Sequence, residues 1–219
     1  MSEIVAGTLY VVATPIGNLG DLTPRAREVL GGVTAIGAED TRNTSVLLGQ
    51  FGIGTPLIAV HDHNEGDIAA KLVARLQAGD SLALVSDAGT PLVSDPGYRL
   101  VRAVREAGLP VVPVPGACAA IAALSVAGIP SDRFCFEGFL PVKGGARRER
   151  LGELLSETRT LVFYESSHRI EESLADLVAV FGAEREATLG RELTKRFVTL
   201  LGPSLGAIQQ AVAGDANQR

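Results

Sequence analysis

Short apolar segments alternate with amphipathic, helix-like segments along the first half of this chain. The apolar runs are Thr8–Ala13, Thr34–Ala38, Leu57–Val60, Leu82–Val85 and Leu109–Val114. Between them, apolar residues recur at helical spacing. Strands that alternate with helices pair in parallel through right-handed crossovers. The pattern therefore predicts an α/β fold whose first domain is built on a parallel sheet.

The stretch from residue 82 to residue 98 points to a binding loop. The buried strand Leu82–Val85 runs into a loop of small and acidic residues, after which we expect Asp95 to cap a helix and Pro96 to begin it. Ligands of open α/β sheets bind at the carboxyl ends of the strands. A plain connection is the alternative, but a loop with two carboxylates and two prolines exceeds what a minimal strand–helix link needs.

Two more polar clusters follow predicted strands at the same edge of the sheet. They are Glu39, Asp40 and Arg42 after the second strand, and His61, His63 and Glu65 after the third. The first cluster also fits a solvated helix N-terminus, where acidic residues are favoured by the helix dipole. The histidines have a metal-like spacing, but on a loop they need not converge, so we expect substrate-facing polar groups and no metal.

A stiff Pro–Gly segment marks the predicted domain boundary. We place the first domain at residues 1–115 and the second at residues 116–219. The second half has shorter alternations, with strands predicted at Phe134–Phe139 and Thr160–Tyr164 and further short strands after residue 186. This pattern predicts a smaller, mixed-sheet second domain.

Basic residues cluster on a chain whose net charge is −5. Residues 143–150 and 191–196 each carry an excess of positive charge, which can neutralise RNA phosphates on an otherwise acidic body. The candidates for RNA contact are Arg147, Arg148, Arg169, Arg191, Lys195 and Arg196. A solvated helix face is the alternative. We expect no membrane segment and a cytoplasmic location, because the apolar runs are too short to span a bilayer and the amino terminus lacks a signal-peptide pattern.

Six ordered motifs together resemble one family. They are LYVVATPIGNLGDLTPRA, AEDTRNTSVLL, LVSDAGTPLVSDPGYRLV, VPVPGACAAIAAL, FYESSHRI and GRELTK. The chain resembles, from about Thr8 to Arg219, the cytidine 2′-O-ribose methyltransferases of bacterial small-subunit ribosomal RNA, within the tetrapyrrole methylase superfamily. DAGTPLVSDPG and FYESSHR are the most specific of these motifs.

The resemblance implies two α/β domains, with S-adenosyl-L-methionine in the cleft between them, and a homodimer that acts on 16S rRNA within the 30S subunit. It assigns cofactor contacts to Asp87, Ala88, Gly89, Thr90, Pro115, Gly116 and Ala117, and from the second domain to Phe139, Leu140, Tyr164 and Glu165. Members of the family continue into a further strand beyond the region that resembles the end of this chain. We therefore expect the second domain to be truncated.

Methyl transfer from a sulfonium to a ribose hydroxyl needs alignment and gains from a general base. We expect Glu39, Asp40 and Arg42 to position the nucleotide and His63 to act as the base. Two other functions stay open. One is C-methylation of a tetrapyrrole on the same scaffold, and the other is a non-enzymatic module that binds RNA through its arginines.

Overall fold

The computed structural model describes residues 4–61 and 65–215. The chain divides into two compact units, Met1–Cys118 and Ala119–Arg219. The sequence-based boundary lies a few residues earlier, between residues 115 and 116. Each unit is described by itself below.

The first unit is built on a five-stranded sheet with the strand order β3-β2-β4-β1-β5. Its strands are β1 (Leu9–Val12), β2 (Ala35–Ala38), β3 (Leu57–Ala59), β4 (Leu82–Val85) and β5 (Val111–Val114). Every pair of neighbours is parallel. The parallel sheet predicted from the alternating sequence pattern is thereby confirmed. The carboxyl ends of all these strands lie at one edge of the sheet, which we call the carboxyl edge.

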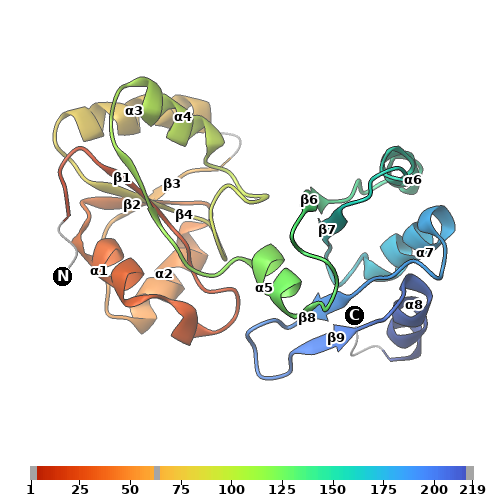
Figure 1. Cartoon of the computed structure of the whole chain (residues 1–219). Helices are drawn as coiled ribbons and strands as arrows, with labels where there is room; N and C mark the ends of the chain where they lie inside the picture. Colours follow the sequence, from red (N-terminus) through yellow and green to blue (C-terminus); the bar gives the residue numbers. More distant parts are fainter. Residues whose placement is uncertain (1–3, 62–64, 216–219) are drawn as a thin grey trace. The chain divides into compact units, whose positions relative to one another are not determined.

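Helices cover both faces of this sheet (Figure 1). They are α1 (Pro24–Gly32), α2 (Thr41–Gln50), α3 (Glu65–Gln77) and α4 (Tyr98–Glu106), with a short 3-10 turn, η1 (Leu19–Asp21). Side chains of α1 and α2 pack on one face, and those of α3 and α4 pack on the other. The sheet is therefore buried on both sides, which explains why its strands read as continuous apolar runs.

The start of α4 differs from its prediction. The helix begins at Tyr98, and Gly97, at φ +126°, takes the N-cap position without a side-chain hydrogen bond. The acceptor comes instead from α3, where Oε1 of the buried Glu65 accepts a hydrogen bond of 3.0 Å from the Leu100 N–H. The prediction that Asp95 caps this helix is therefore wrong, because a carboxylate from a distant segment already takes that role.

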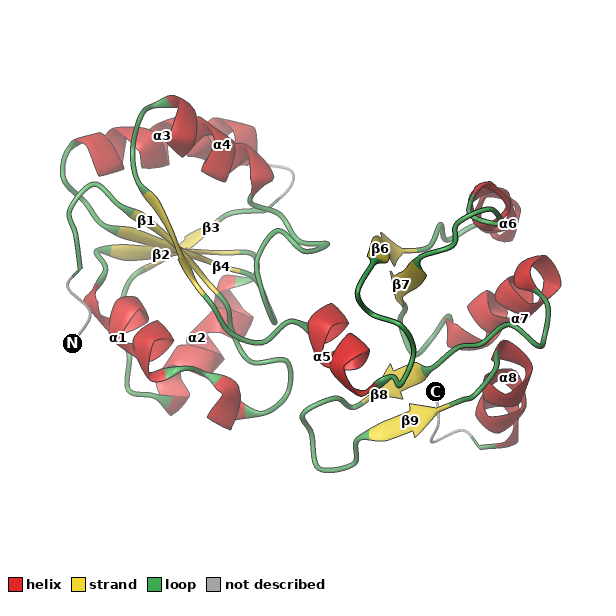
Figure 2. Cartoon of the chain, viewed as in Figure 1, coloured by secondary structure: helices red, strands yellow, loops and turns green. Residues whose placement is uncertain are grey.

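The second unit contains a parallel pair of strands and an antiparallel pair (Figure 2). The parallel pair is β6 (Phe134–Phe139) and β7 (Thr160–Tyr164), and the antiparallel pair is β8 (Leu189–Arg191) and β9 (Thr199–Leu201). Its helices are α5 (Ala119–Val126), α6 (Gly144–Glu153), α7 (Ile170–Phe181) and α8 (Leu205–Gly214). Both strand directions occur, as predicted, but within residues 119–215 they form two small sheets. Apolar side chains of α7 and α8 pack together as the core of this unit.

Within the described residues, no helix has the length and apolar character needed to cross a membrane.

Candidate functional site

A pair of backbone hydrogen bonds links the loops that follow β1 and β4. The Thr14 N–H donates to the Gly89 carbonyl at 2.8 Å, and the Gly89 N–H donates to the Thr14 carbonyl at 3.1 Å. Gly89 has φ +84°, and a Cβ there would lie 3.1 Å from Cγ2 of Ile16. Only glycine suits this position, because the backbone is left-handed and the space beside it is filled.

The loop after β5 joins the same cluster. The Thr90 hydroxyl donates to the Ala117 carbonyl at 2.9 Å. A Cβ on Gly116 would lie 2.9 Å from Cβ of Ala13, so the turn after β5 approaches the end of β1 closely. Two of the segments predicted to hold a cofactor, residues 87–90 and 115–117, are thereby brought side by side at the carboxyl edge.

Asp87 connects this cluster to the start of α2. One carboxylate oxygen of Asp87 accepts from the Asp40 N–H at 3.1 Å, and the other accepts from Nδ2 of Asn43 at 2.9 Å. These residues meet because β2 and β4 are neighbours, with Ala38 in register with Val85. The loop predicted to hold the cofactor is therefore joined by hydrogen bonds to the segment predicted to hold the nucleotide.

Asp40 serves as the N-cap of α2 and at the same time fixes the guanidinium of Arg42. Its carboxylate accepts from the Arg42 N–H at 2.8 Å and from Arg42 Nη2 at 2.8 Å. These side-chain and backbone hydrogen bonds from Arg42 lower the pKa of Asp40 to about 2. Asp40 is consequently a weak base at neutral pH, whereas the Arg42 side chain is 89% exposed and points its charge toward solvent.

The loop between β4 and α4 holds strained backbone conformations. Leu92 and Ser94 adopt φ +72° and +66°, which residues with a side chain rarely do. Asp95 is partly buried in this loop, and its burial raises the pKa of its carboxyl group, although a hydrogen bond with Ser86 opposes the shift. The loop is therefore held in shape by the surrounding structure.

The remaining catalytic candidates of the first unit differ in their positions and contacts. Glu39 directly follows β2 and is partly buried, beside the Asp40–Arg42 pair in sequence. Glu65, considered with the histidines, is committed to the start of α4. His61 is partly buried, and its carbonyl accepts from the Glu65 N–H at 2.9 Å. His63, the predicted base, lies outside the described residues.

Tyr164 organises an aromatic cluster in the second unit. Its ring makes edge-to-face contacts with Phe136 and Phe139, with centroid distances of 5.0 and 5.6 Å. Its hydroxyl oxygen accepts a hydrogen bond of 3.1 Å from the Ala120 N–H in the first turn of α5. Tyr164 therefore fixes the start of α5, while Phe139 stays 53% exposed.

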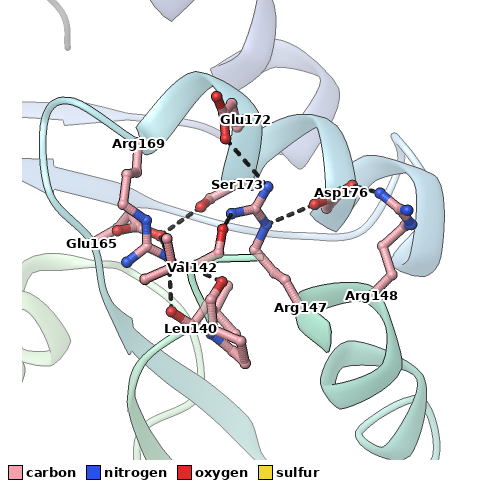
Figure 3. A network of polar contacts seen from close by, with 10 residues as sticks. Leu140, Val142, Arg147, Arg148, Glu165, Arg169, Glu172, Ser173 and Asp176 are labelled. Atoms are coloured by element: carbon pink, nitrogen blue, oxygen red, sulfur yellow. Dashed lines mark hydrogen bonds and ion pairs between the residues drawn. The ribbon is translucent and has the colours of Figure 1, made fainter. Parts of the chain in front are cut away.

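Arg169 ties together the other two predicted cofactor residues of this unit (Figure 3). Its Nη2 donates to the Leu140 carbonyl at 2.7 Å and lies 3.3 Å from Oε2 of Glu165. The Ser173 hydroxyl also donates to Glu165. Arg169 thus has internal partners, and the geometry favours a structural role over the predicted contact with RNA.

Arg147 is also directed inward. It is buried, its Nε lies 2.6 Å from Oδ2 of Asp176, and Nη1 of Arg148 lies 2.9 Å from Oδ1 of the same carboxylate (Figure 3). Burial raises the pKa of Asp176, but hydrogen bonds from Arg148 and Arg147 outweigh it and hold the pKa below its ordinary value. Arg147 offers no surface to a nucleic acid, whereas the Arg148 side chain is 54% exposed.

The four predicted cofactor residues of the second unit line one cavity of about 1100 Å³. They are Phe139, Leu140, Tyr164 and Glu165. The other walls combine aliphatic side chains of α5, α7 and β8 with polar and charged residues of the segments 129–133, 155–160 and 185–188. Because the cavity exceeds the usual size of a small-molecule pocket, its presence alone does not identify a ligand.

Sequence reasoning missed three residues of these networks. Thr14 follows a strand like many loop residues, and Asp176 looks like an ordinary polar position on a helix. Asn43 carries a weak signal, because it lies in the first turn of a helix that begins directly after a strand. Only the pairing of β2 with β4 brings Asn43 to Asp87.

Comparison with solved structures gives the fold. The methyltransferase CobJ matches with a TM-score of 0.66 and 21% identity, covering 91% of this chain and 87% of that one. The cobalamin biosynthetic enzyme cobalt precorrin-4 methyltransferase matches with a TM-score of 0.64 and 14% identity, covering 97% and 92%. At these identities the likeness concerns architecture only.

Comparison with curated proteins gives closer relatives. A ribosomal RNA small subunit methyltransferase I of Xylella fastidiosa (strain Temecula1) is 62% identical over 97% of this chain and 78% of its own length. The protein of that name from Escherichia coli O157:H7 is 58% identical over 97% of this chain and 74% of its own length. Residues 8–208 match the family described as Tetrapyrrole (Corrin/Porphyrin) Methylases. The chain therefore belongs to the tetrapyrrole methylase family and, within it, to the ribosomal RNA small subunit methyltransferases I.

Proposed function

We propose that this protein transfers a methyl group from S-adenosyl-L-methionine to the 2′-oxygen of a cytidine in 16S ribosomal RNA. The observation that carries the proposal is the 62% and 58% identity, over 97% of the chain, to two ribosomal RNA small subunit methyltransferases I. Membership of a methylase family supports the reaction type. The 2′-oxygen and the cytidine are the finer parts of the proposal and rest on the motif resemblance.

The loops at the carboxyl edge suit the cofactor. When bound, S-adenosylmethionine supplies an electrophilic methyl group on a positively charged sulfur. Gly89 and Gly116 leave no room for a Cβ, so backbone groups line this region closely, and the Asp87 carboxylate adds negative charge beside it. We infer that Asp87–Thr90 and Pro115–Ala117 hold the cofactor. Contacts from Phe139, Leu140, Tyr164 and Glu165 stay a prediction.

The charge pattern beside β2 suggests how the RNA is positioned. With its pKa near 2, Asp40 does not take the proton of a ribose hydroxyl at neutral pH. We propose instead that Asp40 holds the guanidinium of Arg42 in place and that Arg42 contacts an RNA phosphate, with Glu39 beside them. His63 stays the predicted base. Among the basic residues, Arg148, Arg191, Lys195 and Arg196 form the proposed RNA-contact set.

The two alternative functions are less well supported. A tetrapyrrole C-methyltransferase shares this fold. However, a uroporphyrin-III-C-methyltransferase and the cobalt precorrin-4 methyltransferase are 23% and 14% identical to this chain, whereas the relatives at 62% and 58% are named for ribosomal RNA. A non-enzymatic RNA-binding module does not agree with membership of a methylase family. A homodimer, a 30S substrate and a cytoplasmic location complete the proposal.

The proposal is tested by tritiated methyl transfer to 30S subunits that lack the modification, followed by mapping of the labelled nucleotide. We expect incorporation at a ribose 2′-oxygen, which makes the adjacent phosphodiester resistant to alkali. Label on a base atom would contradict the proposed acceptor. Label in a precorrin but not in 30S subunits would favour the tetrapyrrole alternative.

A matched pair of glycine variants tests the cofactor loops. Gly89→Ala places a methyl group 3.1 Å from Ile16 in a left-handed backbone, and we expect it to abolish calorimetric binding of S-adenosylmethionine. Gly79→Ala is the control, because Gly79 has φ +100° but nothing within 4 Å of the added Cβ. Equal loss of binding in both variants would point to general unfolding and contradict the assignment.

A further inference from the structure

The tip of the hairpin formed by β8 and β9 displays an aromatic ring among positive charges. We propose that this tip, residues 191–198, is a platform on which an unpaired RNA base stacks against the ring of Phe197. The inference rests on the proposed function, because it takes RNA as the substrate. It extends that function by specifying single-stranded RNA at a defined residue.

The two halves of the tip face different environments. Residues 191–194 are partly buried, and Leu193 folds back onto the hairpin, since a Cβ on Gly190 would lie 3.2 Å from Cδ2 of Leu193. Residues 195–198 are exposed, and Phe197 is 71% exposed. The partly buried Leu193 anchors the loop, and Phe197 is exposed to solvent.

Local hydrogen bonds hold the tip in one conformation. Glu192 and Thr194 adopt φ +53° and +66°, and the Lys195 N–H donates to the Glu192 carbonyl at 2.9 Å. The Thr199 hydroxyl donates to the Phe197 carbonyl at 3.2 Å. A ring presented by an ordered loop loses little conformational entropy when a ligand binds. Strained conformations of this kind occur where function requires a defined shape.

The positive charges around the Phe197 ring favour binding of a nucleic acid. The guanidinium carbon of Arg196 lies 5.4 Å from the centroid of the Phe197 ring, an arrangement that a stacked base can extend. Arg191, Lys195 and Arg196 outnumber the one carboxylate of the tip, that of Glu192, which lies 2.8 Å from Nζ of Lys195, so the tip keeps an excess of positive charge. Phenylalanine and arginine are also common in protein interfaces, so a second copy of the chain is the competing occupant that the test below has to exclude.

A base can stack on a protein side chain only when it is free of the RNA helix. Sequence-independent stacking on aromatic residues is the usual way in which proteins bind single strands. A ring at the end of a hairpin can reach such a base, while nearby arginine and lysine side chains neutralise its phosphates. The expected ligand is therefore a single-stranded segment of the RNA substrate.

The absence of tryptophan from the sequence makes a direct optical test possible. The variant Phe197→Trp introduces the sole indole of these 219 residues. We expect its fluorescence to be quenched by a single-stranded fragment of small-subunit ribosomal RNA and to change little with a duplex of the same sequence. In parallel, we expect Phe197→Leu to weaken binding of the single strand about tenfold. Phe134→Leu, which removes another exposed ring, should leave this affinity unchanged.

Several outcomes would overturn the inference. Equal quenching by the duplex or by heparin would show attraction by charge alone. A blue shift that grows with protein concentration in the absence of RNA would show that a second copy covers the ring. Methyl transfer to 30S subunits by the unmodified chain, without quenching in the indole variant, would leave the proposed function intact and reject the platform. If the unmodified chain neither methylates 30S subunits nor binds the single strand, both proposals are wrong.

Discussion

Two arginine–aspartate pairs in this chain have similar geometry and opposite surroundings. Arg42 and Asp40 approach to 2.8 Å with side chains 89% and 27% exposed, whereas Arg147 and Asp176 approach to 2.6 Å with side chains 4% and 11% exposed. The exposed pair is free to meet a ligand, while the buried pair joins α6 to α7. An arginine in a basic cluster is thus a candidate for RNA contact only if its charge reaches solvent.

The largest expected effect comes from breaking the buried pair. Arg147→Met leaves the Asp176 carboxylate with Arg148 as its remaining close partner, and we expect a loss of about 3–5 kcal/mol in the free energy of unfolding measured in urea. Arg148→Gln, at the exposed side of the same carboxylate, should cost less than about 1 kcal/mol. Equal losses in the two variants would show that burial does not separate these arginines.

Replacing Arg42 in the exposed pair should weaken RNA binding and leave the stability of the fold unchanged. Arg42→Gln is expected to leave the melting temperature unchanged, to weaken RNA binding about tenfold and to reduce the slope of log affinity against log salt by about one. Titrations at several salt concentrations measure this slope. Arg102→Gln serves as a control, since Arg102 is also exposed and also paired with a carboxylate, Glu106. An unchanged slope for Arg42→Gln would contradict the proposed contact between Arg42 and an RNA phosphate.

Asp87 tests whether the carboxyl edge acts as a unit. Asp87→Asn weakens the bonds to the Asp40 N–H and the Asn43 amide, and we expect methyl transfer to fall about fivefold with little change in stability. Asp80→Asn disrupts an ion pair with Arg75 before β4, away from this edge, and should not affect the rate. A similar fall in both variants would contradict a specific role for Asp87.

Asp95 should give the smallest effect, and its sign depends on pH. Burial raises the pKa of this carboxyl group, so the folded state is penalised when the group is charged. Asp95→Asn is therefore expected to raise the melting temperature by about 2 °C at pH 7. The gain should shrink as the pH falls toward and below the ordinary value of 3.8, where the native carboxyl group is protonated in both states. A gain that persists at pH 3 would contradict this explanation.

Much of the fold could be predicted from local sequence patterns. Leu82–Val85, Phe134–Phe139 and Thr160–Tyr164 are strands with the predicted limits, because apolar and aromatic residues dominate each of them and residues that interrupt this pattern flank them. Thr23 and Pro24 begin α1 as capping preferences require. Such features depend on residues that are close together in the sequence, so one sequence is enough to predict them.

The proximity of the candidate site residues at one edge of the sheet could be predicted, but the contacts between them could not. The edge of the sheet that carries Asp87 and Asp40 follows from parallel pairing, whereas the hydrogen bond between them depends on which strand lies beside which. The order β3-β2-β4-β1-β5 leaves no local trace in the sequence. The prediction that Arg147 contacts RNA has the same weakness. The sequence shows the positive charge of this residue, but its burial depends on how the helices pack.

The capping of α4 by Glu65 has a consequence for how the first unit folds. The acceptor for the Leu100 N–H lies 35 residues earlier in the chain, so α4 has no local signal that fixes its first turn. A peptide that spans α4 alone lacks this acceptor and should fray from its amino end. We expect the register of α4, and with it the length of the loop that leads from β4, to be fixed when α3 docks. We therefore expect the loop between β4 and α4 to become ordered late and cooperatively in folding.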